Sequence, residues 1–196
     1  MATQHLIIFV KNPIPGTVKT RVARTVGHQK ATDVYRHLLQ HTQDVTRSGP
    51  WQKTVYYGDF INPADGWNGY ARALQTGADL GQRMANAFGE CFTAGAKQVV
   101  IIGSDCLSIG PAHIQAAFEA LSQTDVVIGP ATDGGYYLLG MSRLHTYLFE
   151  NMPWSEPQLG AQTRQAIQAH GQTLTLLEEL TDIDEWVDYE RAMGAV

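Results

Sequence analysis

The sequence predicts an α/β protein whose mostly parallel β-sheet is covered by helices on both faces. Short apolar runs alternate with longer amphipathic segments along its 196 residues. Two of those runs, residues 6–10 and 99–102, are continuously apolar, which is typical of parallel strands buried on both faces. Strands that alternate with helices form βαβ units, in which each helix crosses one face of the sheet. We expect a single domain over residues 1–196, because this length suits one sizeable core.

Each expected element has a local reason in the sequence. Strands are expected at the short apolar runs, and helices where apolar residues recur every three or four positions. Proline favours the first turn of a helix, and glycine follows the last. A stretch rich in Asn, Pro, Asp and Gly indicates a surface loop. In chain order we expect strand 6–10, a helix with its apolar stripe at 31–45, strand 54–57, loop 60–69, helix 80–92, strand 99–102, a helix from Pro111 to about residue 121, strands 126–128 and 136–139, helix 157–169, strand 173–177 and a short helix around Trp186 and Tyr189.

Composition and charge exclude several classes of protein. Hydrophobic residues make up 44% and charged residues 17%, which argues against disorder. A net charge of −5 gives no general reason to expect a nucleic-acid partner. The two cysteines are too few for a disulfide framework, and no apolar run reaches the length of a membrane span. The first residues lack the features of a signal peptide, so we expect a cytoplasmic protein without a membrane partner.

The loop after the first strand carries the strongest functional signal. Its prolines, among them Pro15, and the adjacent Gly16 predict a sharply turned chain, and we expect a helix to begin near Thr17. This is neither a Walker A loop nor the glycine-rich fingerprint of dinucleotide-binding folds. Its chemistry must therefore come from its side chains and from the start of the helix.

Three cations, Lys11, Lys19 and Arg21, lie within this loop. Backbone N–H groups at a helix start, together with Lys and Arg side chains, make a binding site for anions. Arginine adds a bidentate fork for phosphate oxygens. We interpret the loop as a phosphate-binding site; the alternative is a solvated basic loop.

Two aspartates follow apolar runs in a way that suits a metal. Asp105 comes just after the strand at 99–102, where a carboxylate can hold Mg²⁺ while phosphates supply further oxygens. Asp184 precedes the last short helix and is a candidate second carboxylate. The structural alternatives are a turn or cap role for Asp105 and an N-cap role near Asp184.

A third acidic position stands in a glycine-rich turn. Asp133 is followed by Gly134 and Gly135, a pair that lets the backbone approach a ligand or turn tightly. The alternative is a hairpin turn before the strand at 136–139. Both interpretations remain open at this point.

The ordered set of motifs resembles a known family. It is the bacterial GT-A-like glycosyltransferase family linked to arsenosugar biosynthesis, often described only as a nucleotide-diphospho-sugar transferase. The resemblance covers nearly the whole chain and rests on the ordered motifs Phe9-Val10-Lys11-x-Pro13-x-Pro15-Gly16-x-x-Lys19-Thr20-Arg21, Asp79-Leu80-Gly81-Gln82-Arg83-Met84, Gly103-Ser104-Asp105-Cys106, Gly129-Pro130-Ala131-x-Asp133-Gly134-Gly135-Tyr136, Pro153-Trp154-Ser155 and Asp182-Ile183-Asp184.

The resemblance implies a three-layer α/β/α Rossmann-like, GT-A-like fold with a nucleotide at the carboxyl edge of the sheet. It implies Mg²⁺ or Mn²⁺ on Asp105, with Asp184 as a second metal carboxylate. It places nucleotide binding at Lys11, Pro15, Gly16, Lys19, Arg21, Gln82, Arg83 and Ser104. It places the acceptor or sugar pocket at Asp133, Gly134, Gly135, Tyr136 and Trp154.

One position departs from the family pattern. The family usually has proline two residues after the metal aspartate, whereas this chain has Leu107. Only one acidic residue stands at this site, so the paired aspartates of a full DxD motif are absent. Both differences bear on how the Asp105 loop is aimed at a metal.

Three hypotheses for function follow. The leading one is transfer of a sugar from a nucleoside-diphosphate sugar to a small acceptor, with Asp133 as a candidate base. The alternative is nucleotidyl transfer from a nucleoside triphosphate to a phosphorylated acceptor, because the superfamily also contains the molybdopterin and 2-phospho-lactate guanylyltransferases. A third is a non-catalytic nucleotide-binding domain. The base, sugar, acceptor and oligomeric state are not predicted.

Overall fold

A computed structural model describes residues 3–194 and places a seven-stranded mixed sheet at the centre of the molecule. The strand order is β3-β2-β1-β4-β6-β5-β7, and only β6 runs antiparallel to its neighbours among the described residues. The predicted α/β class with a mostly parallel sheet is therefore confirmed. The strands are β1 (Gln4–Val10), β2 (Gln52–Tyr57), β3 (Ala71–Leu74), β4 (Gln98–Ile102), β5 (Val126–Pro130), β6 (Tyr136–Met141) and β7 (Leu174–Leu176).

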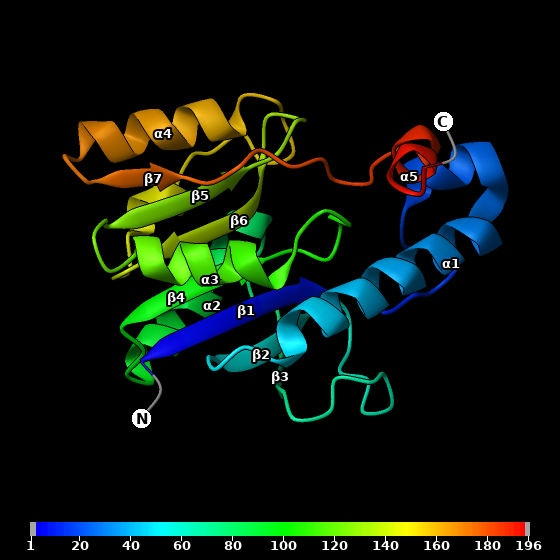
Figure 1. Cartoon of the computed structure of the whole chain (residues 1–196), viewed down its shortest axis with the longest axis horizontal. Coiled ribbons are helices and arrows are strands. Elements are labelled where there is room, and N and C mark those ends of the chain that lie inside the picture. The colour runs from blue at the N-terminus through cyan, green and yellow to red at the C-terminus, as the bar shows by residue number, and fades with distance from the viewer. Residues whose placement is uncertain (1–2, 195–196) are drawn as a thin grey trace.

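Helices cover both faces of this sheet (Figure 1). Strand β1 shows why, since Leu6 and Ile8 belong to one apolar core and Ile7 to the other. The first core takes in α1, α3 and α5, and the second takes in α2, α4 and a 3₁₀ helix, η1. The helices are α1 (Thr20–Arg47), α2 (Leu80–Thr93), α3 (Pro111–Ala120), η1 (Thr146–Phe149), α4 (Leu159–Ala169) and α5 (Trp186–Ala192).

Successive strands are added first on one side of β1 and then on the other, so the strand order reverses between β1 and β4. From β1 it builds outward to β2 and β3, and it then returns to add β4 on the other side of β1. Open α/β sheets bind ligands at such a switch point, in the crevice beyond the carboxyl ends of the strands. The crevice beyond β1 and β4 is thus where a ligand is expected.

The helix predicted to begin near Thr17 begins instead at Thr20. Lys19 is its N-cap and adopts the left-handed conformation (φ 47°, ψ 47°), so the chain turns once more before the helix starts. Gly27 (φ 82°, ψ 161°) then kinks α1, which separates a short first segment from the long remainder. The first segment therefore departs from the axis of the longer part.

Two further differences concern the edge of the sheet. Strand β3 was not predicted, because its residues are half-buried or exposed and show no apolar run. The predicted loop at 60–69 is confirmed, yet it contributes the fully buried Trp67 to the core beside α1.

Within residues 3–194, none of the helices combines the length and the apolar character that crossing a membrane requires.

Candidate functional site

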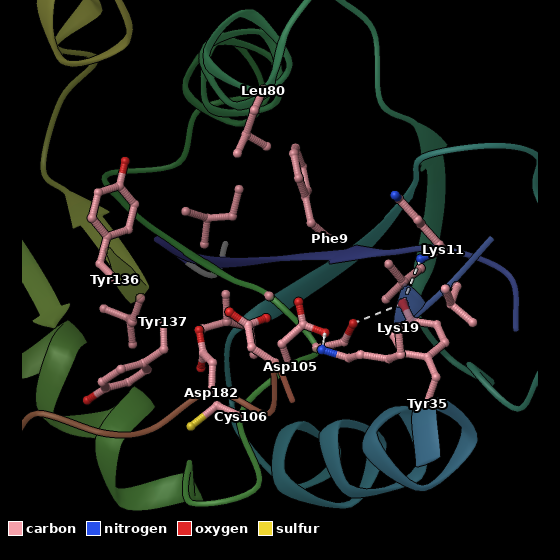
Figure 2. A pocket seen from close by; sticks show the side chains of 18 of the residues that line it. Phe9, Lys11, Lys19, Tyr35, Leu80, Asp105, Cys106, Tyr136, Tyr137 and Asp182 are labelled. Carbon is pink, nitrogen blue, oxygen red and sulfur yellow. Dashed lines mark hydrogen bonds and ion pairs between the residues drawn. The ribbon is translucent and has the colours of Figure 1, made fainter. Parts of the chain in front are cut away.

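A pocket of about 480 Å³ opens at the predicted edge of the sheet, beyond the carboxyl ends of β1 and β4 (Figure 2). Strand β6 enters from its amino end, because it runs antiparallel to β4. The pocket is lined on one side by charged residues of α1, the β4–α3 loop and the segment before α5, and on the other by apolar side chains. Its polar lining includes Lys11, Lys19, Arg21, Tyr35, Ser104, Asp105, Asp182 and Asp184.

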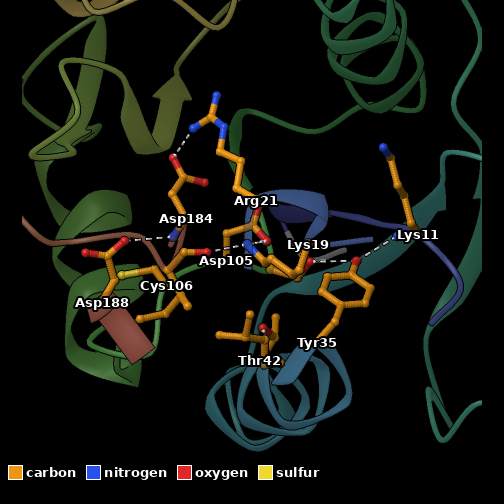
Figure 3. A network of polar contacts seen from close by, with 12 residues as sticks. Lys11, Lys19, Arg21, Tyr35, Thr42, Asp105, Cys106, Asp184 and Asp188 are labelled. Atoms are coloured by element: carbon orange, nitrogen blue, oxygen red, sulfur yellow. Dashed lines mark hydrogen bonds and ion pairs between the residues drawn. The ribbon is translucent and has the colours of Figure 1, made fainter. Parts of the chain in front are cut away.

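Tyr35 fixes the floor of the pocket. Its hydroxyl accepts a hydrogen bond from the Lys11 backbone N–H at 2.9 Å and lies 3.1 Å from the hydroxyl oxygen of Ser104. The residue is 4% exposed, and burial, followed by the charge of Asp105, raises the pKa of its phenol. Tyr35 therefore joins the ends of β1 and β4 to α1 as a neutral hydrogen-bonding group (Figure 3).

Lys19 and Asp105 form an ion pair at the centre of this network, with Nζ 2.6 Å from Oδ1. The Lys19 side chain is 7% exposed, whereas that of Asp105 is 48% exposed and faces the pocket. Lys19 Nζ also donates to the Ile183 carbonyl at 2.7 Å, and the Ile183 N–H donates to the Asp105 carbonyl at 2.8 Å. These contacts hold the β4–α3 loop against the segment that leads into α5.

Arg21 lies just after Lys19, in the first turn of α1, and pairs with Asp184, at 3.0 Å between Nη1 and Oδ2. Both side chains are about half exposed, so solvent screens the pair and it adds little to stability. Burial, opposed by Lys19 and Arg21, raises the pKa of Asp184 above its ordinary value. The pair therefore places an arginine fork and a carboxylate at the pocket mouth, where both can reach a ligand.

Asp182 is a pocket residue that the sequence interpretation passed over. Its Oδ1 atom is buried and has no hydrogen-bond partner within residues 3–194. Burial, and then the nearby carboxylates Asp105 and Asp133, raise the pKa of Asp182 to about 7. The Asp-Ile-Asp spacing in the sequence was the available signal, since two residues along an extended chain return to the same side.

The structure brings together the predicted charged residues that follow β1 and β4, but not all of the other predicted residues. Eight predicted residues line the pocket: Lys11, Lys19, Arg21, Ser104, Asp105, Tyr136, Trp154 and Asp184. The remaining ones, all within the described residues, lie outside its lining: Pro15, Gly16, Gln82, Arg83, Asp133, Gly134 and Gly135.

The Asp133–Gly134–Gly135 turn is a hairpin between β5 and β6. Asp133 Oδ1 accepts from the Gly135 N–H at 2.9 Å, and Gly134 has a φ of 91°. The Gly134 carbonyl accepts from Gly160 N at the start of α4, at 2.8 Å. A Cβ on Gly134 would lie 2.1 Å from the carbonyl oxygen of Pro157. The glycines thus serve the turn and the close approach of α4.

Gln82 and Arg83 complete the amino end of their own helix. Asp79 is the N-cap of α2 and accepts from the Gln82 N–H, and the Gln82 side chain accepts from Ala78 N. The Arg83 Nε atom donates to the Gly77 carbonyl at 3.3 Å. The implied opening of a helix by these two residues is seen, outside the pocket lining.

The opposite wall of the pocket is apolar and partly aromatic. Leu80 of α2, 41% exposed, and Phe9 at the end of β1 face the opening beside Tyr136 (Figure 2). Trp154 lies against the first turn of α2, because a Cβ on Gly81 would come within 2.5 Å of its ring. The site therefore offers one half that suits a charged group and another that suits an apolar one.

The carboxylates suit a hard divalent cation, although not a cage made by protein alone. Within residues 3–194, no three His, Cys, Asp or Glu side chains are grouped so that they could hold a metal. Asp105 and Asp184 supply oxygen donors, and Asp182 adds the buried Oδ1 atom described above. Mg²⁺ commonly binds through one or two carboxylates while a substrate's phosphates supply further oxygens. This donor set fits such a shared site.

Sequence comparison identifies one family. The model of a family described as "Uncharacterized protein conserved in bacteria (DUF2064)" matches residues 28–156. The match includes Tyr35, Asp105 and Asp133, whereas Lys19 and Asp184 lie outside it. No functionally curated protein matches the chain.

Solved structures share the fold. One, from Desulfovibrio desulfuricans G20, is provisionally described as a nucleotide-diphospho-sugar transferase; it is 31% identical over 94% of this chain and 84% of its own, with a TM-score of 0.89. A CMP:2-keto-3-deoxy-manno-octonic acid synthetase complexed with CTP is 10% identical (98% and 97% covered, TM-score 0.59). The 2-C-methyl-D-erythritol 4-phosphate cytidylyltransferase of Thermus thermophilus is 17% identical (100% and 98% covered, TM-score 0.58). The predicted Rossmann-like, nucleotide-diphospho-sugar transferase type of fold is confirmed.

Proposed function

The chain belongs to the DUF2064 family of bacterial proteins, and from that premise we propose that it transfers a sugar from a nucleoside-diphosphate sugar to a small acceptor. One observation carries this proposal: Lys19 and Arg21, at the start of α1, meet Asp105 and Asp184 in the same pocket. Cations and carboxylates converging beyond parallel strands are what a diphosphate with its divalent ion requires. The 31% identical D. desulfuricans protein, with its transferase description, supports the same class.

The chemistry can be assigned to residues of this chain. In glycosyl transfer, the bond between the anomeric carbon and the diphosphate oxygen breaks, and a bond to an acceptor oxygen forms. Lys19, Arg21 and the backbone N–H groups at the start of α1 would offset the charge on the leaving diphosphate. Mg²⁺ or Mn²⁺ held by Asp105 and Asp184 would supply further positive charge there.

The acceptor proton needs a carboxylate near the reacting atoms. Asp133 was the predicted base, but it lies outside the pocket lining and is engaged by the Gly135 N–H. Asp182 lines the pocket, and its pKa, raised to about 7, suits a group that takes up and releases a proton near neutral pH. We therefore assign to Asp182 the role of the base that takes the acceptor's proton. Asp133 then serves to raise the pKa of Asp182. The apolar wall of Phe9, Leu80 and Trp154 would limit the water that competes with the acceptor.

Nucleotidyl transfer is the second candidate, because the fold is shared with a synthetase complexed with CTP and with a cytidylyltransferase. In that reaction an acceptor phosphate oxygen attacks the α-phosphorus of a nucleoside triphosphate. The bond to the bridging oxygen breaks and pyrophosphate leaves. Lys19 and Arg21 would then bind the β- and γ-phosphates.

Calorimetric titration with UDP, GDP, CTP and GTP, and with UDP- and GDP-sugars, tests the proposal with and without Mg²⁺ or Mn²⁺. We expect a nucleoside diphosphate and its sugar to bind, more tightly with metal. No binding of any nucleotide would overturn both enzyme hypotheses. Product analysis separates them, since glycosyl transfer releases a nucleoside diphosphate and nucleotidyl transfer releases pyrophosphate. Binding without turnover of any donor would favour a non-catalytic domain.

A further inference from the structure

Lys19 is a buried cation in the middle of the pocket's carboxylates. Its Nζ atom lies 2.6 Å from Asp105 Oδ1 and 2.7 Å from the Ile183 carbonyl oxygen, and its side chain is 7% exposed. Ile183 stands between Asp182 and Asp184, so the ammonium group sits where the β4–α3 loop meets the segment before α5. This is the meeting place of the carboxylates proposed to face the metal (Figure 3).

In the pocket, the carboxylates outnumber the cations near them, and the two cations, Lys19 and Arg21, differ in how deeply they are buried. Three carboxylates, those of Asp105, Asp182 and Asp184, line the pocket. Arg21 pairs with Asp184 but is 54% exposed, so water screens its charge. Lys19 is therefore the buried positive charge that offsets the Asp105 carboxylate, the role that a divalent ion would take in a loaded site.

The Asp105 carboxylate, which would hold the metal, already carries the Lys19 ammonium group on its Oδ1 atom. Mg²⁺ binds carboxylate oxygens at about 2.0–2.1 Å. A metal on Asp105 Oδ1 would lie within a few ångströms of Nζ, and two cations at such a distance repel strongly in a site that is partly shielded from water. Metal binding therefore requires Lys19 to withdraw or to find an anion of its own.

The backbone conformation of Lys19 limits how its ammonium group can leave Asp105. Its left-handed conformation (φ 47°, ψ 47°) ends the loop and begins α1, and the Lys19 carbonyl accepts from Ala23 N at 2.9 Å. The backbone is thus fixed by the helix, so a withdrawal has to come from rotation about the bonds of the long side chain once a new anion replaces Asp105. The ammonium group can move from Asp105 to a phosphate in the pocket by rotation of the side chain alone.

We propose that Lys19 is the built-in counter-cation of this site: it occupies the cation position at Asp105 until a diphosphate draws it away and opens that position to a divalent ion. The inference rests on the proposed function and adds its regulation. Metal binding is weak without nucleotide, and each ligand strengthens the binding of the other by the same factor. Free divalent ions then do not fill the site ahead of the substrate.

The decisive measurement uses Mn²⁺ alone, with no nucleotide present. Equilibrium binding, followed by the electron paramagnetic resonance of free Mn²⁺, is compared for the wild-type protein and Lys19→Met. Removing the competing cation should lower the Kd for Mn²⁺ about tenfold or more, which corresponds to about 1.4 kcal/mol. Lys19→Arg keeps the charge and should bind Mn²⁺ as weakly as the wild type.

Lys97→Met is the matched control. It makes the same change of side chain at an exposed position just before β4, on the opposite edge of the sheet, and should leave the Kd unchanged. Circular dichroism shows whether each variant is folded. If folded Lys19→Met binds Mn²⁺ no more tightly than the wild type, the inference is wrong. This result does not depend on any nucleotide, so it is distinct from a failure of the nucleotide titrations that test the proposed function.

Discussion

Trp154 lies so close to Gly81 that a Cβ added to the glycine would come within 2.5 Å of the indole ring and 2.7 Å of the Phe149 carbonyl oxygen. Gly81 is the second residue of α2, and Trp154 forms part of the apolar wall of the pocket. The shape of that wall therefore depends on a glycine within a helix, where glycine is otherwise unfavourable.

Gly81→Ala should displace Trp154 and deform the apolar wall. We expect a loss of about 1 to 3 kcal/mol in the free energy of unfolding, because the added methyl group overpacks the wall, and weaker binding of the proposed donor or acceptor. Gly89→Ala is the matched control in the same helix, since the nearest described atom to its Cβ would be in Leu144, at 3.9 Å. Urea denaturation and ligand titration measure both effects. Equal behaviour of the two variants would contradict the role given to Trp154.

Tyr35→Phe removes the hydroxyl that joins Lys11 and Ser104. Both partners lose a hydrogen bond, and Ser104 is buried, so we expect a cost of about 1 to 3 kcal/mol in stability. The phosphate loop should also lose its fixed position, which weakens nucleotide binding. Tyr70→Phe is the control. It removes a hydroxyl group that hydrogen-bonds to Thr46, which lies in α1 as Tyr35 does but outside the pocket lining. Nucleotide affinity that falls equally in both variants would argue against a local effect.

Asp182→Asn should stabilise the protein in a pH-dependent way. The pKa of Asp182 is raised from 3.8 to about 7 by burial first and by Asp105 and Asp133 next. Between these values the folded state holds a proton that the unfolded state releases, so the free energy of unfolding falls as the pH rises through this window. The cost in stability of burying the ionised Asp182 carboxylate is complete above about pH 7, and it is absent below the pKa that this residue has in the unfolded state.

Thermal unfolding at about pH 8 and about pH 4 checks this prediction for Asp182. The asparagine variant should gain about 1 to 4 kcal/mol at the higher pH and little at the lower one, while turnover falls. A gain that is the same at both pH values would show that the carboxylate charge is not its cause.

Gly134→Ala should be among the more costly glycine substitutions in this chain. Its φ of 91° disfavours any L side chain, and the new Cβ would also lie 2.1 Å from the Pro157 carbonyl oxygen. Gly69→Ala separates the two effects, because its φ is 85° but no atom of the described residues lies within 4 Å of the added Cβ. We expect about 1 kcal/mol for Gly69→Ala and at least twice that for Gly134→Ala, measured by urea denaturation. Similar losses would mean that the α4 start moves aside freely.

The sequence was informative where local pattern and tertiary structure agree. The apolar runs of β1 and β4 identify central strands, and the charged residues that follow them, Lys19 and Asp105, lie in the pocket. Strand β3 was not predicted from the sequence, because this half-exposed edge strand contains no apolar run. Its strand character comes from pairing with β2.

The missed site residues depend on contacts between distant segments. Tyr35 occupies an ordinary apolar position of the α1 stripe, and only the fold brings its hydroxyl to Ser104. Asp182 is partly buried because its segment is fixed across the pocket: Thr132 N donates to the Leu180 carbonyl, and Ile183 N donates to the Asp105 carbonyl. No local pattern contains these contacts. For Asp133 and its glycines the sequence left a ligand-binding role and a hairpin turn open; the hairpin turn is seen, and the ligand-binding role stays a prediction.

Asp105→Ala tests the centre of the site. Its side chain is 48% exposed at the pocket rim, so the fold should survive, with a circular dichroism spectrum like that of the wild type. Lys19 loses its ion pair but keeps the Ile183 carbonyl, which suggests a stability cost of about 1 to 3 kcal/mol. Turnover of the proposed reaction should fall by about two orders of magnitude or more, because the carboxylate is assigned to the metal and orients Lys19. Asp44→Ala also removes an aspartate from an ion pair, but on the exposed surface of α1, and should leave turnover unchanged. Turnover in Asp105→Ala close to that of Asp44→Ala would place the chemistry elsewhere.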